Sequence, residues 1–166
     1  MRWDLCNVGV TVTVNVGSNP RGVAFDGTNI WVANSGPGTV SKIDPVLNTV
    51  TATVTVGASP VGVAFDGTNI WVANSDSNTV SKINPSTNLV TATVTVGSYP
   101  SEVAFDGTNI WVTNNGFPGT VSKINPSTNL VTATVTGLNS PSGVAFDGTN
   151  IWVTDFFLGT VSKIRV

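Results

Sequence analysis

The chain has 166 residues and a formal net charge of −2, and 40 % of its residues are hydrophobic while only 10 % are charged. This length and composition predict one folded domain with a hydrophobic core, and the lack of a basic patch excludes nucleic acid as a partner. No apolar run approaches the ~20 residues of a membrane helix, and residues 1–10 lack the apolar region of a signal peptide.

A stretch of identical sequence, AFDGTNIWV, occurs at residues 24–32 and returns at 64–72, 104–112 and 145–153. Its tryptophans follow one another at intervals of 40, 40 and 41 residues. Self-similarity at a period of this length is typical of repeat architectures. The chain therefore contains four like units, and the fold must be built from them.

Each period is predicted to form four short strands, described here for the first period. Residues 22–25 are a brief apolar run that ends at an Asp-Gly turn signal. Residues 29–34 are β-branched and aromatic, and residues 39–43 stop at an Asp-Pro pair that suits a type I turn. Residues 48–57 alternate threonine with apolar residues, which is the pattern of a strand with one wetter face.

Repeated four-stranded meanders of about 40 residues are the blades of a β-propeller. We therefore predict an all-β propeller with about sixteen strands. A lone blade cannot bury both faces of its sheet, so the blades must stack, and Trp31, Trp71, Trp111 and Trp152 are expected to be buried between them. The single domain, 1–166, divides into blades at about 18–57, 58–97, 98–138 and 139–166.

The N-terminal segment is predicted to complete the last blade, which ends after its third strand at GTVSKIRV. Residues 8–17 contain VTVTVNVG, which aligns with VTATVTVG at 50–57. They are therefore expected to form a closing outer strand. Closure between two chains makes an eight-bladed homodimer, which we favour. Closure within one chain makes a four-bladed monomer, and exchange that never closes makes a filament.

The residue types that usually perform acid–base or metal chemistry are scarce. The chain has no histidine and one cysteine, Cys6, which leaves no catalytic triad, no ordinary zinc site and no intramolecular disulfide. Most acidic residues fall in turns, where aspartate before glycine usually caps the backbone, and DGTN alone is too poor in acids to bind calcium. We therefore expect no enzymatic activity, no cofactor and no metal.

Comparing the four copies with one another separates two faces of the fold. The first turn is DGTN in every copy, whereas the second turns and the connections between blades differ each time. Variable loops on a rigid scaffold often carry binding sites, although loops also vary when nothing constrains them. The candidate ligand-binding residues on this variable-loop face are Arg21, Asn34, Ser35, Asp76, Tyr99, Asn114, Phe117, Asp155, Phe156 and Phe157.

The stretch IWVANSDSNTVSKINPSTNLVTATVTVG, residues 70–97, resembles the YVTN family of β-propeller repeats. Trp71-Val72-Ala73-Asn74 stands at the signature tetrapeptide of that family, with tryptophan in place of its usual tyrosine. The resemblance implies an extracellular or cell-surface protein of a prokaryote. More distantly, the repeat is similar to the virginiamycin B lyase propellers, which are enzymes.

Two functions of different classes follow from these observations. The first is a binding module that holds a glycan, peptide or protein on the variable-loop face. The second is a structural protein whose function is self-assembly by strand exchange. An engineered or trimmed propeller fragment is compatible with either function.

Overall fold

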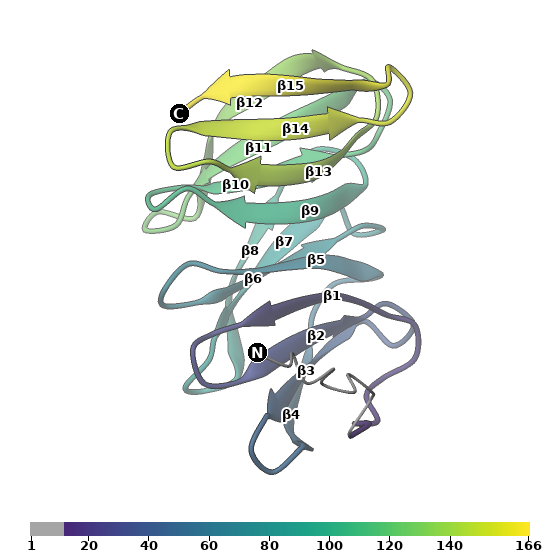
Figure 1. The fold of residues 1–166 in the computed structure, drawn as a ribbon, viewed down its shortest axis with the longest axis vertical. Coiled ribbons are helices and arrows are strands. Elements are labelled where there is room, and N and C mark those ends of the chain that lie inside the picture. Colours follow the sequence, from purple (N-terminus) through teal and green to yellow (C-terminus); the bar gives the residue numbers. More distant parts are fainter. Residues whose placement is uncertain (1–11) are drawn as a thin grey trace, which may run out of the picture.

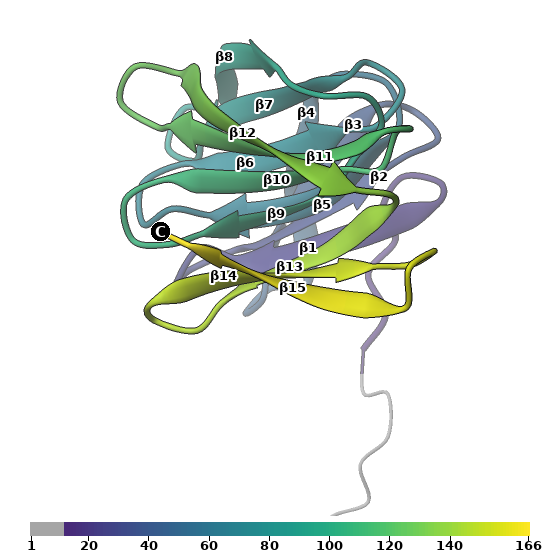
Figure 2. The ribbon, with the colours of Figure 1, turned by 90° about the horizontal axis from the view of Figure 1, so that it is seen from above.

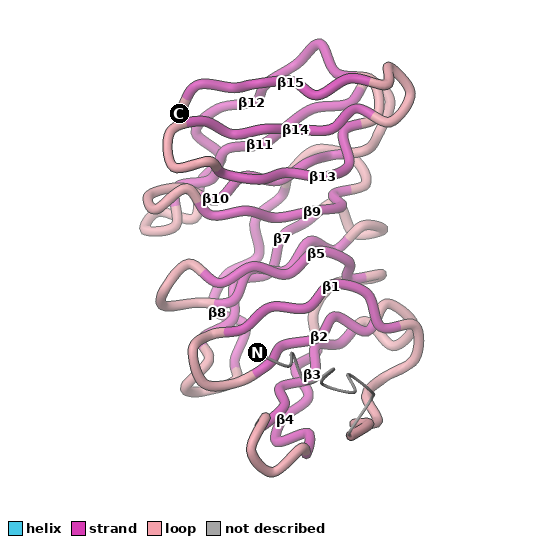
Figure 3. Tube along the Cα trace, viewed as in Figure 1, coloured by secondary structure: helices cyan, strands magenta, loops and turns pink. Residues whose placement is uncertain are grey.

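The protein is built from β-strands in the computed structural model, which describes residues 12–166. None of these residues is helical, and Figure 3 shows strands joined by loops. The predicted all-β fold is confirmed. The strands of the described residues are β1 (Pro20–Phe25), β2 (Ile30–Asn34), β3 (Thr39–Asp44), β4 (Thr49–Thr55), β5 (Pro60–Phe65), β6 (Ile70–Asn74), β7 (Thr79–Asn84), β8 (Leu89–Thr95), β9 (Pro100–Phe105), β10 (Ile110–Asn114), β11 (Gly119–Asn125), β12 (Leu130–Leu138), β13 (Pro141–Phe146), β14 (Asn150–Asp155) and β15 (Thr160–Arg165).

Consecutive strands pair into four antiparallel sheets, which are β1–β4, β5–β8, β9–β12 and β13–β15. The innermost strands β1, β5, β9 and β13 follow one another along the stack (Figure 1). The first and last sheets lie at opposite ends, so this one chain forms an open arc of blades (Figures 1 and 2). Among the residues that the structure describes, no neighbouring sheet covers one face of the first sheet or one face of the last sheet.

The predicted closing strand, residues 8–17, lies partly outside the described residues. Residues 12–16 belong to no strand, and β13–β15 form a sheet of three strands. Completion of the last blade by the N-terminal segment therefore stays a prediction.

Strand register brings a tryptophan and a lysine together in every blade. In the first blade, Trp31 on β2 lies opposite Ala24 on β1 and Lys42 on β3. The Lys42 ammonium lies 5.3 Å from the Trp31 ring centroid, and the other blades repeat this cation–π contact at 5.0 to 5.5 Å. The lysine thus fixes the position of each tryptophan ring relative to its own sheet, and the ring can pack on the next blade.

The hydrophobic core lies between consecutive sheets. Between the first two sheets, Trp31 and Val40 pack with Val63, Ile70 and Val72 of the second blade. The same positions form the core between the second and third sheets, and a similar cluster lies between the third and fourth. Because apolar side chains leave water only where two sheets meet, each blade is stabilised chiefly by its neighbours.

The expectation that all four repeated tryptophans are buried holds for three of them. Trp31 and Trp71 are fully buried and Trp111 is 2 % exposed, but Trp152 is 38 % exposed. Within the described residues no sheet covers the outer face of β13–β15. The prediction is wrong for Trp152 because it treats the blades as equivalent, whereas the last sheet has a neighbour on one side only.

An aspartate organises the DGTN turn of every blade. In the third blade, one carboxylate oxygen of Asp106 accepts hydrogen bonds from the backbone N–H groups of Thr108 at 2.7 Å and Asn109 at 2.6 Å. The other oxygen accepts a hydrogen bond from the Trp111 indole N–H at 2.6 Å. The other three blades repeat these contacts. The capping role predicted for these aspartates is confirmed, and the same carboxylate also fixes the tryptophan.

We predict that Asp106→Ala lowers the free energy of unfolding by about 2 kcal/mol, because it removes a charged acceptor from three donors, one of them a buried indole. Urea denaturation followed by circular dichroism measures the change. Asp147→Ala is the matched control, since it removes the same contacts beside the exposed Trp152, whose indole can bond water. The control should lose less stability, and an equal loss from both variants would contradict the role of burial.

Burial acts to raise the pKa of Asp106, but hydrogen bonds from the Trp111 indole and the turn backbone together outweigh it and hold the pKa below its ordinary value of 3.8. Such a carboxyl stabilises the fold fully above its unfolded pKa and loses that contribution as the pH falls through its folded pKa. The stability difference between wild type and Asp106→Ala should therefore be constant near neutral pH and shrink below about pH 4. Urea denaturation at neutral and acid pH measures this difference, and a gap that persists into strong acid contradicts the assignment.

Candidate functional site

The loops lie on two opposite faces of the stack, as expected for a meander. The second turns meet the blade connections on one face, where the Ser35 N–H donates to the Asn19 carbonyl and the Asn115 N–H donates to the Tyr99 carbonyl. In Figure 1 this variable-loop face is at the right of the stack and the DGTN turns are at the left. Each face therefore presents loops from several blades.

The residues predicted to bind a ligand divide into exposed and buried groups. The exposed ones are Arg21, Asp76, Tyr99, Phe117, Phe156 and Phe157, Ser35 is half-buried, and Asn34, Asn114 and Asp155 are buried.

Asn34 and Asn114 lie inside their blades, which does not suit the ligand-binding role predicted for them. Their side-chain N–H groups donate to the hydroxyls of Ser41 and Ser122, each at 2.9 Å. A Cβ added to Gly17 would lie 2.7 Å from the Asn34 Cβ, so the start of the first blade packs directly on this side chain. Burial and packing give these asparagines a structural role, and we leave them out of the site.

Asp155 is also buried, beneath the turn that follows β14. Its carboxylate accepts hydrogen bonds from the backbone N–H groups of Asn139 at 2.7 Å, Ser140 at 3.2 Å and Leu158 at 3.2 Å. Burial acts to raise the pKa of this carboxyl, but the backbone hydrogen bonds lower it overall. Asp155 therefore positions the loop at 156–158 and does not itself face a ligand.

Four exposed aromatic rings lie on the variable-loop face of the third and fourth blades. We call Tyr99, Phe117, Phe156 and Phe157 the aromatic patch, in which Phe117, at 88 % exposed, is the most open. Phe156 and Phe157 meet edge to face, with ring centroids 5.5 Å apart and ring planes at 71°. Rings so open to solvent add little to the core and are available to a ligand.

A run of hydrogen bonds holds the loops of the aromatic patch together. The Asn115 N–H donates to the Tyr99 carbonyl at 2.9 Å, and the Ser140 hydroxyl donates to the Asn115 side-chain oxygen. The Phe156 N–H then donates to the Ser140 carbonyl at 2.9 Å. Two connections and two second turns are thereby joined in one line, so loops far apart in sequence form one surface.

A polar cluster at the starts of β9 and β13 is absent from the sequence-based predictions. Glu102, the one glutamate of the chain, stands where the other blades have Gly22, Gly62 and Gly143. Burial raises the pKa of its carboxyl, and a hydrogen bond from the Val103 N–H opposes this only in part. Comparing the four copies at this position would have singled out Glu102, because it breaks the repeat.

The hydroxyls around Glu102 connect β9 and β10 of the third blade with β13 of the fourth blade. The Ser101 and Thr113 hydroxyl oxygens are 3.0 Å apart, and Thr113 donates to the Ser142 carbonyl at 2.9 Å. The Glu102 N–H donates to the Thr113 hydroxyl oxygen at 3.1 Å. The polar cluster, defined as Ser101, Glu102, Thr113 and Ser142, therefore belongs to the same two blades as the aromatic patch.

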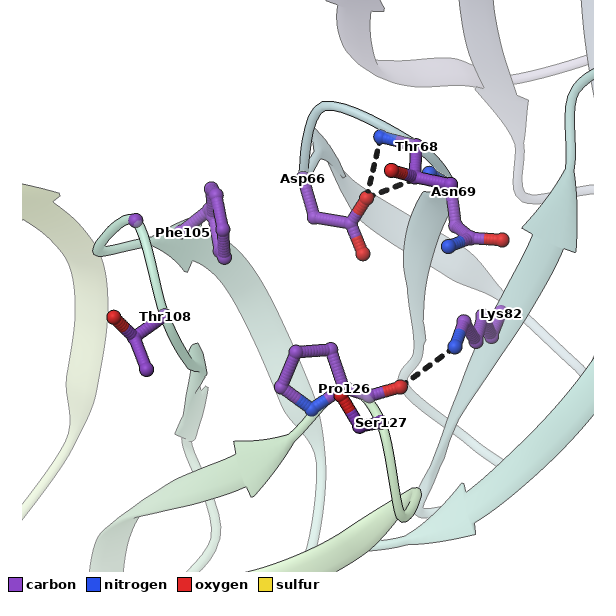
Figure 4. Close-up of a pocket in the computed structure, with 9 residues that line it drawn as sticks. Asp66, Thr68, Asn69, Lys82, Phe105, Thr108, Pro126 and Ser127 are labelled. Carbon is purple, nitrogen blue, oxygen red and sulfur yellow. Dashed lines mark hydrogen bonds between the residues drawn. The ribbon is translucent and has the colours of Figure 1, made fainter.

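A cleft between neighbouring blades opens on the opposite, DGTN face. Between the second and third blades its volume is about 480 Å³, and Figure 4 shows Asp66 and Lys82 of one blade across from Phe105 and Pro126 of the next. An equivalent cleft of about 280 Å³ lies between the first and second blades. Each cleft is thus made from two blades.

The charged groups of this cleft are bonded within the protein. Lys82 Nζ donates to the Pro126 carbonyl at 2.6 Å and lies 5.2 Å from the Trp71 ring centroid. The Asp66 carboxylate accepts hydrogen bonds from its own turn and from the Trp71 indole. Because the Lys82–Pro126 bond joins one blade to the next and Asp66 is bonded within its own blade, we interpret the cleft as a structural contact between blades.

Among residues 12–166, no group of three or more cysteine, aspartate or glutamate side chains is placed to hold a metal ion. The described part of the chain also has no helix long and apolar enough to cross a membrane. The expectations of no metal and no cofactor stay predictions.

Known proteins resemble this chain in structure. No family model and no curated protein matches its sequence. Hydrazine synthase of Kuenenia stuttgartiensis matches with a TM-score of 0.82 and 21 % identity, over 95 % of this chain and 49 % of that chain. A catalytically inactive virginiamycin B lyase from Staphylococcus aureus, solved with Quinupristin, matches with a TM-score of 0.75 and 17 % identity, over 92 % of this chain and 53 % of that one. A functionally unknown protein from Desulfotomaculum acetoxidans matches with a TM-score of 0.70 and 18 % identity, over 88 % and 55 %.

These likenesses establish the propeller fold, and this chain spans about half the length of each similar chain. The resemblance to the virginiamycin B lyase propellers is confirmed at the level of fold. Membership of the YVTN family stays a prediction, because no family model matches.

The expectation that the chain is not an enzyme is contradicted. Two of the similar structures are enzymes by name, so enzymes use this architecture. The expectation rested on the missing histidine and on acids that lie in turns. Glu102 weakens that reasoning, because it lies on a strand, within a polar cluster, and its pKa is raised by burial.

Proposed function

We propose that this chain is a propeller binding module that holds a carbohydrate on the aromatic patch of its variable-loop face. The observation that carries the proposal is the set of exposed rings held together by the hydrogen bonds between their loops. Exposed apolar surface commonly marks a binding site where its side chains are in contact, as Phe156 and Phe157 are, with ring centroids 5.5 Å apart.

The surroundings of the rings favour a sugar over an ionic ligand. A sugar ring has apolar C–H faces, which stack on aromatic rings, and a rim of hydroxyls, which need hydrogen-bonding partners. The exposed side chains of Asn78 and Asn115 lie at the loops of the patch, and the Asn78 side chain accepts the Tyr99 N–H at 2.9 Å. Only 10 % of the chain is charged, so stacking and hydrogen bonds are the interactions that this surface offers.

Glu102 belongs to the proposed site. It follows Tyr99 of the patch by three positions, at the start of the innermost strand β9. A half-buried carboxyl with a raised pKa can accept or donate a hydrogen bond to a sugar hydroxyl. Because the other blades have glycine at this position, its presence here is not a requirement of the blade itself.

The extracellular or cell-surface location implied by the YVTN resemblance would bring such a module to carbohydrates, and this location is part of the proposal. A peptide or protein ligand is the competing outcome. A glycan array with the 166-residue chain tests the proposal first, and an array without any bound oligosaccharide would overturn the carbohydrate assignment.

For an oligosaccharide found in this way, the double variant Phe156→Ala, Phe157→Ala should bind about 30-fold more weakly. Each stacked ring contributes about 1 kcal/mol, and two rings together correspond to that change in the dissociation constant. Isothermal titration calorimetry measures it. Because both rings are exposed, circular dichroism should show an unchanged fold.

The control for this variant changes Thr28, Thr68, Thr108 and Thr149 to alanine, which alters the DGTN face alone. Wild-type affinity is expected for the control. Loss of binding in the threonine variant with retention in the phenylalanine variant would place the ligand on the other face.

Glu102→Gly should weaken binding of the same oligosaccharide several-fold, about 1 kcal/mol for one lost hydrogen bond, while the fold is retained. Glycine is the residue of the other three blades at this position, so the replacement restores the repeat and does not disturb the strand. Calorimetry gives the affinity and urea denaturation the stability. Unchanged affinity would remove Glu102 from the site.

A further inference from the structure

One face of the first sheet and one face of the last sheet have no neighbouring sheet within residues 12–166. The equivalent faces of the other sheets are each covered by the next sheet. Between blades, a back face carrying tryptophan and valine packs on a front face carrying valine and isoleucine, as Trp31 and Val40 pack on Val63 and Ile70. The front face of the first sheet and the back face of the last sheet have the same residue types and no covering sheet within residues 12–166. We call them the front end face and the back end face.

Exposure shows how much apolar surface these end faces leave in water. On the front end face Val23 is 63 % exposed, whereas its equivalent Val63 is 7 % exposed. On the back end face Val161 is 59 % exposed, whereas its equivalent Val40 is fully buried. Phe25 and Trp152 are likewise exposed at the two ends. Contiguous apolar surface of this kind is characteristic of an interface.

We propose that a second copy of this chain covers both faces, with the front end face of each copy packed on the back end face of the other. A second copy is the occupant that the geometry favours, because this pair of faces already packs together between successive blades of the chain. The interface between copies continues that internal one, with the same residue types at the same positions.

A cleft that one chain leaves incomplete supports the same occupant. Inside the chain, the lysine of one blade donates to a proline carbonyl of the next, from Lys42 to Pro85 at 2.7 Å and from Lys82 to Pro126 at 2.6 Å (Figure 4). Lys163 lies in the same way over Trp152, 5.5 Å from the ring centroid, on the back end face. Docking of a front end face would bring Pro45 of the second copy to the place of that carbonyl, so each copy completes the other's cleft.

The sequence of the N-terminal segment agrees with the same docking. Residues 10–17 precede β1, which lies on the front end face, and their sequence matches the fourth strand at 50–57. Within residues 12–166 the sheet β13–β15 has three strands, and no further strand pairs with β15. Front-to-back contacts form a ring when the rotation closes, and two copies give eight blades, within the ~4–8 of known propellers.

The mass of the assembly in solution tests the proposal directly. Sedimentation equilibrium of the 166-residue chain should report twice the 17.1 kDa chain mass across a range of protein concentrations. Val23→Lys and Val161→Glu each place an unpaired charge in both interfaces of the ring, so each variant alone should sediment at the mass of one chain. Leu89→Lys and Leu130→Glu are matched controls, because these leucines are equally exposed on outer strands away from the end faces, and they should keep the doubled mass.

Mixing the two end-face variants separates front-to-back docking from any other pairing. In the mixed ring one interface is wild type, and the other sets the positive charge introduced by Val23→Lys against the negative charge introduced by Val161→Glu. An equimolar mixture of the two variants should therefore regain the doubled mass. Circular dichroism establishes that each variant is folded before mixing. A monomeric wild type, a mass that grows without limit, or a mixture that stays monomeric would each overturn the proposal.

Discussion

In every blade a tryptophan indole N–H donates to the carboxylate of the aspartate in the preceding turn, at 2.6 to 2.7 Å. The second oxygen of that carboxylate holds two backbone N–H groups of the turn, so one side chain fixes both the turn and the ring. The ring fills the space between two sheets, and the lysine above it reaches a carbonyl of the next blade in the first and second blades. A local turn is thereby tied to the packing of neighbouring blades, which explains why AFDGTNIWV is identical in all four blades.

The opposite face of the stack carries no such requirement. Its second turns and connections are bonded to one another through backbone groups, as between Asn115 and Tyr99, and through side chains that differ from blade to blade, such as Asn78 and Asp155, so no one side chain is required in every blade. The aromatic patch and the polar cluster around Glu102 both belong to the third and fourth blades, where these positions differ from the other copies. The DGTN face is thus constant in sequence and supports the stacking of the blades, while the variable-loop face changes. Many proteins divide scaffold and binding surface in this way.

Much of the fold follows from the sequence because the signal is repeated. Strand positions, turn residues and the stacking of blades are each indicated four times, so a weak local pattern becomes a strong one. The end blades are harder to predict, since Trp152 has the same sequence neighbours as Trp71 and differs only in what covers it. The exposure of the candidate site residues is hard to predict for a related reason. Asn34 and Phe117 both lie near a variable turn, but Asn34 ends strand β2 and is buried, whereas Phe117 lies in the turn after β10 and is exposed, and the exact end of each strand is not evident from the sequence.

Front-to-back docking and the proposed carbohydrate site together have a consequence for binding that neither proposal has alone. Because each interface would repeat the step from one blade to the next, the second copy of the proposed ring would continue the arc in the same sense. The variable-loop faces of both copies would then lie on the same side of that ring. The proposed ring would carry two aromatic patches, related by its two-fold axis, on one surface. A carbohydrate with repeated units can occupy both, and the second contact then forms at the high effective concentration set by the first. Modest stacking at each patch would thus be sufficient for firm attachment to a polymer, while a single short sugar would bind weakly.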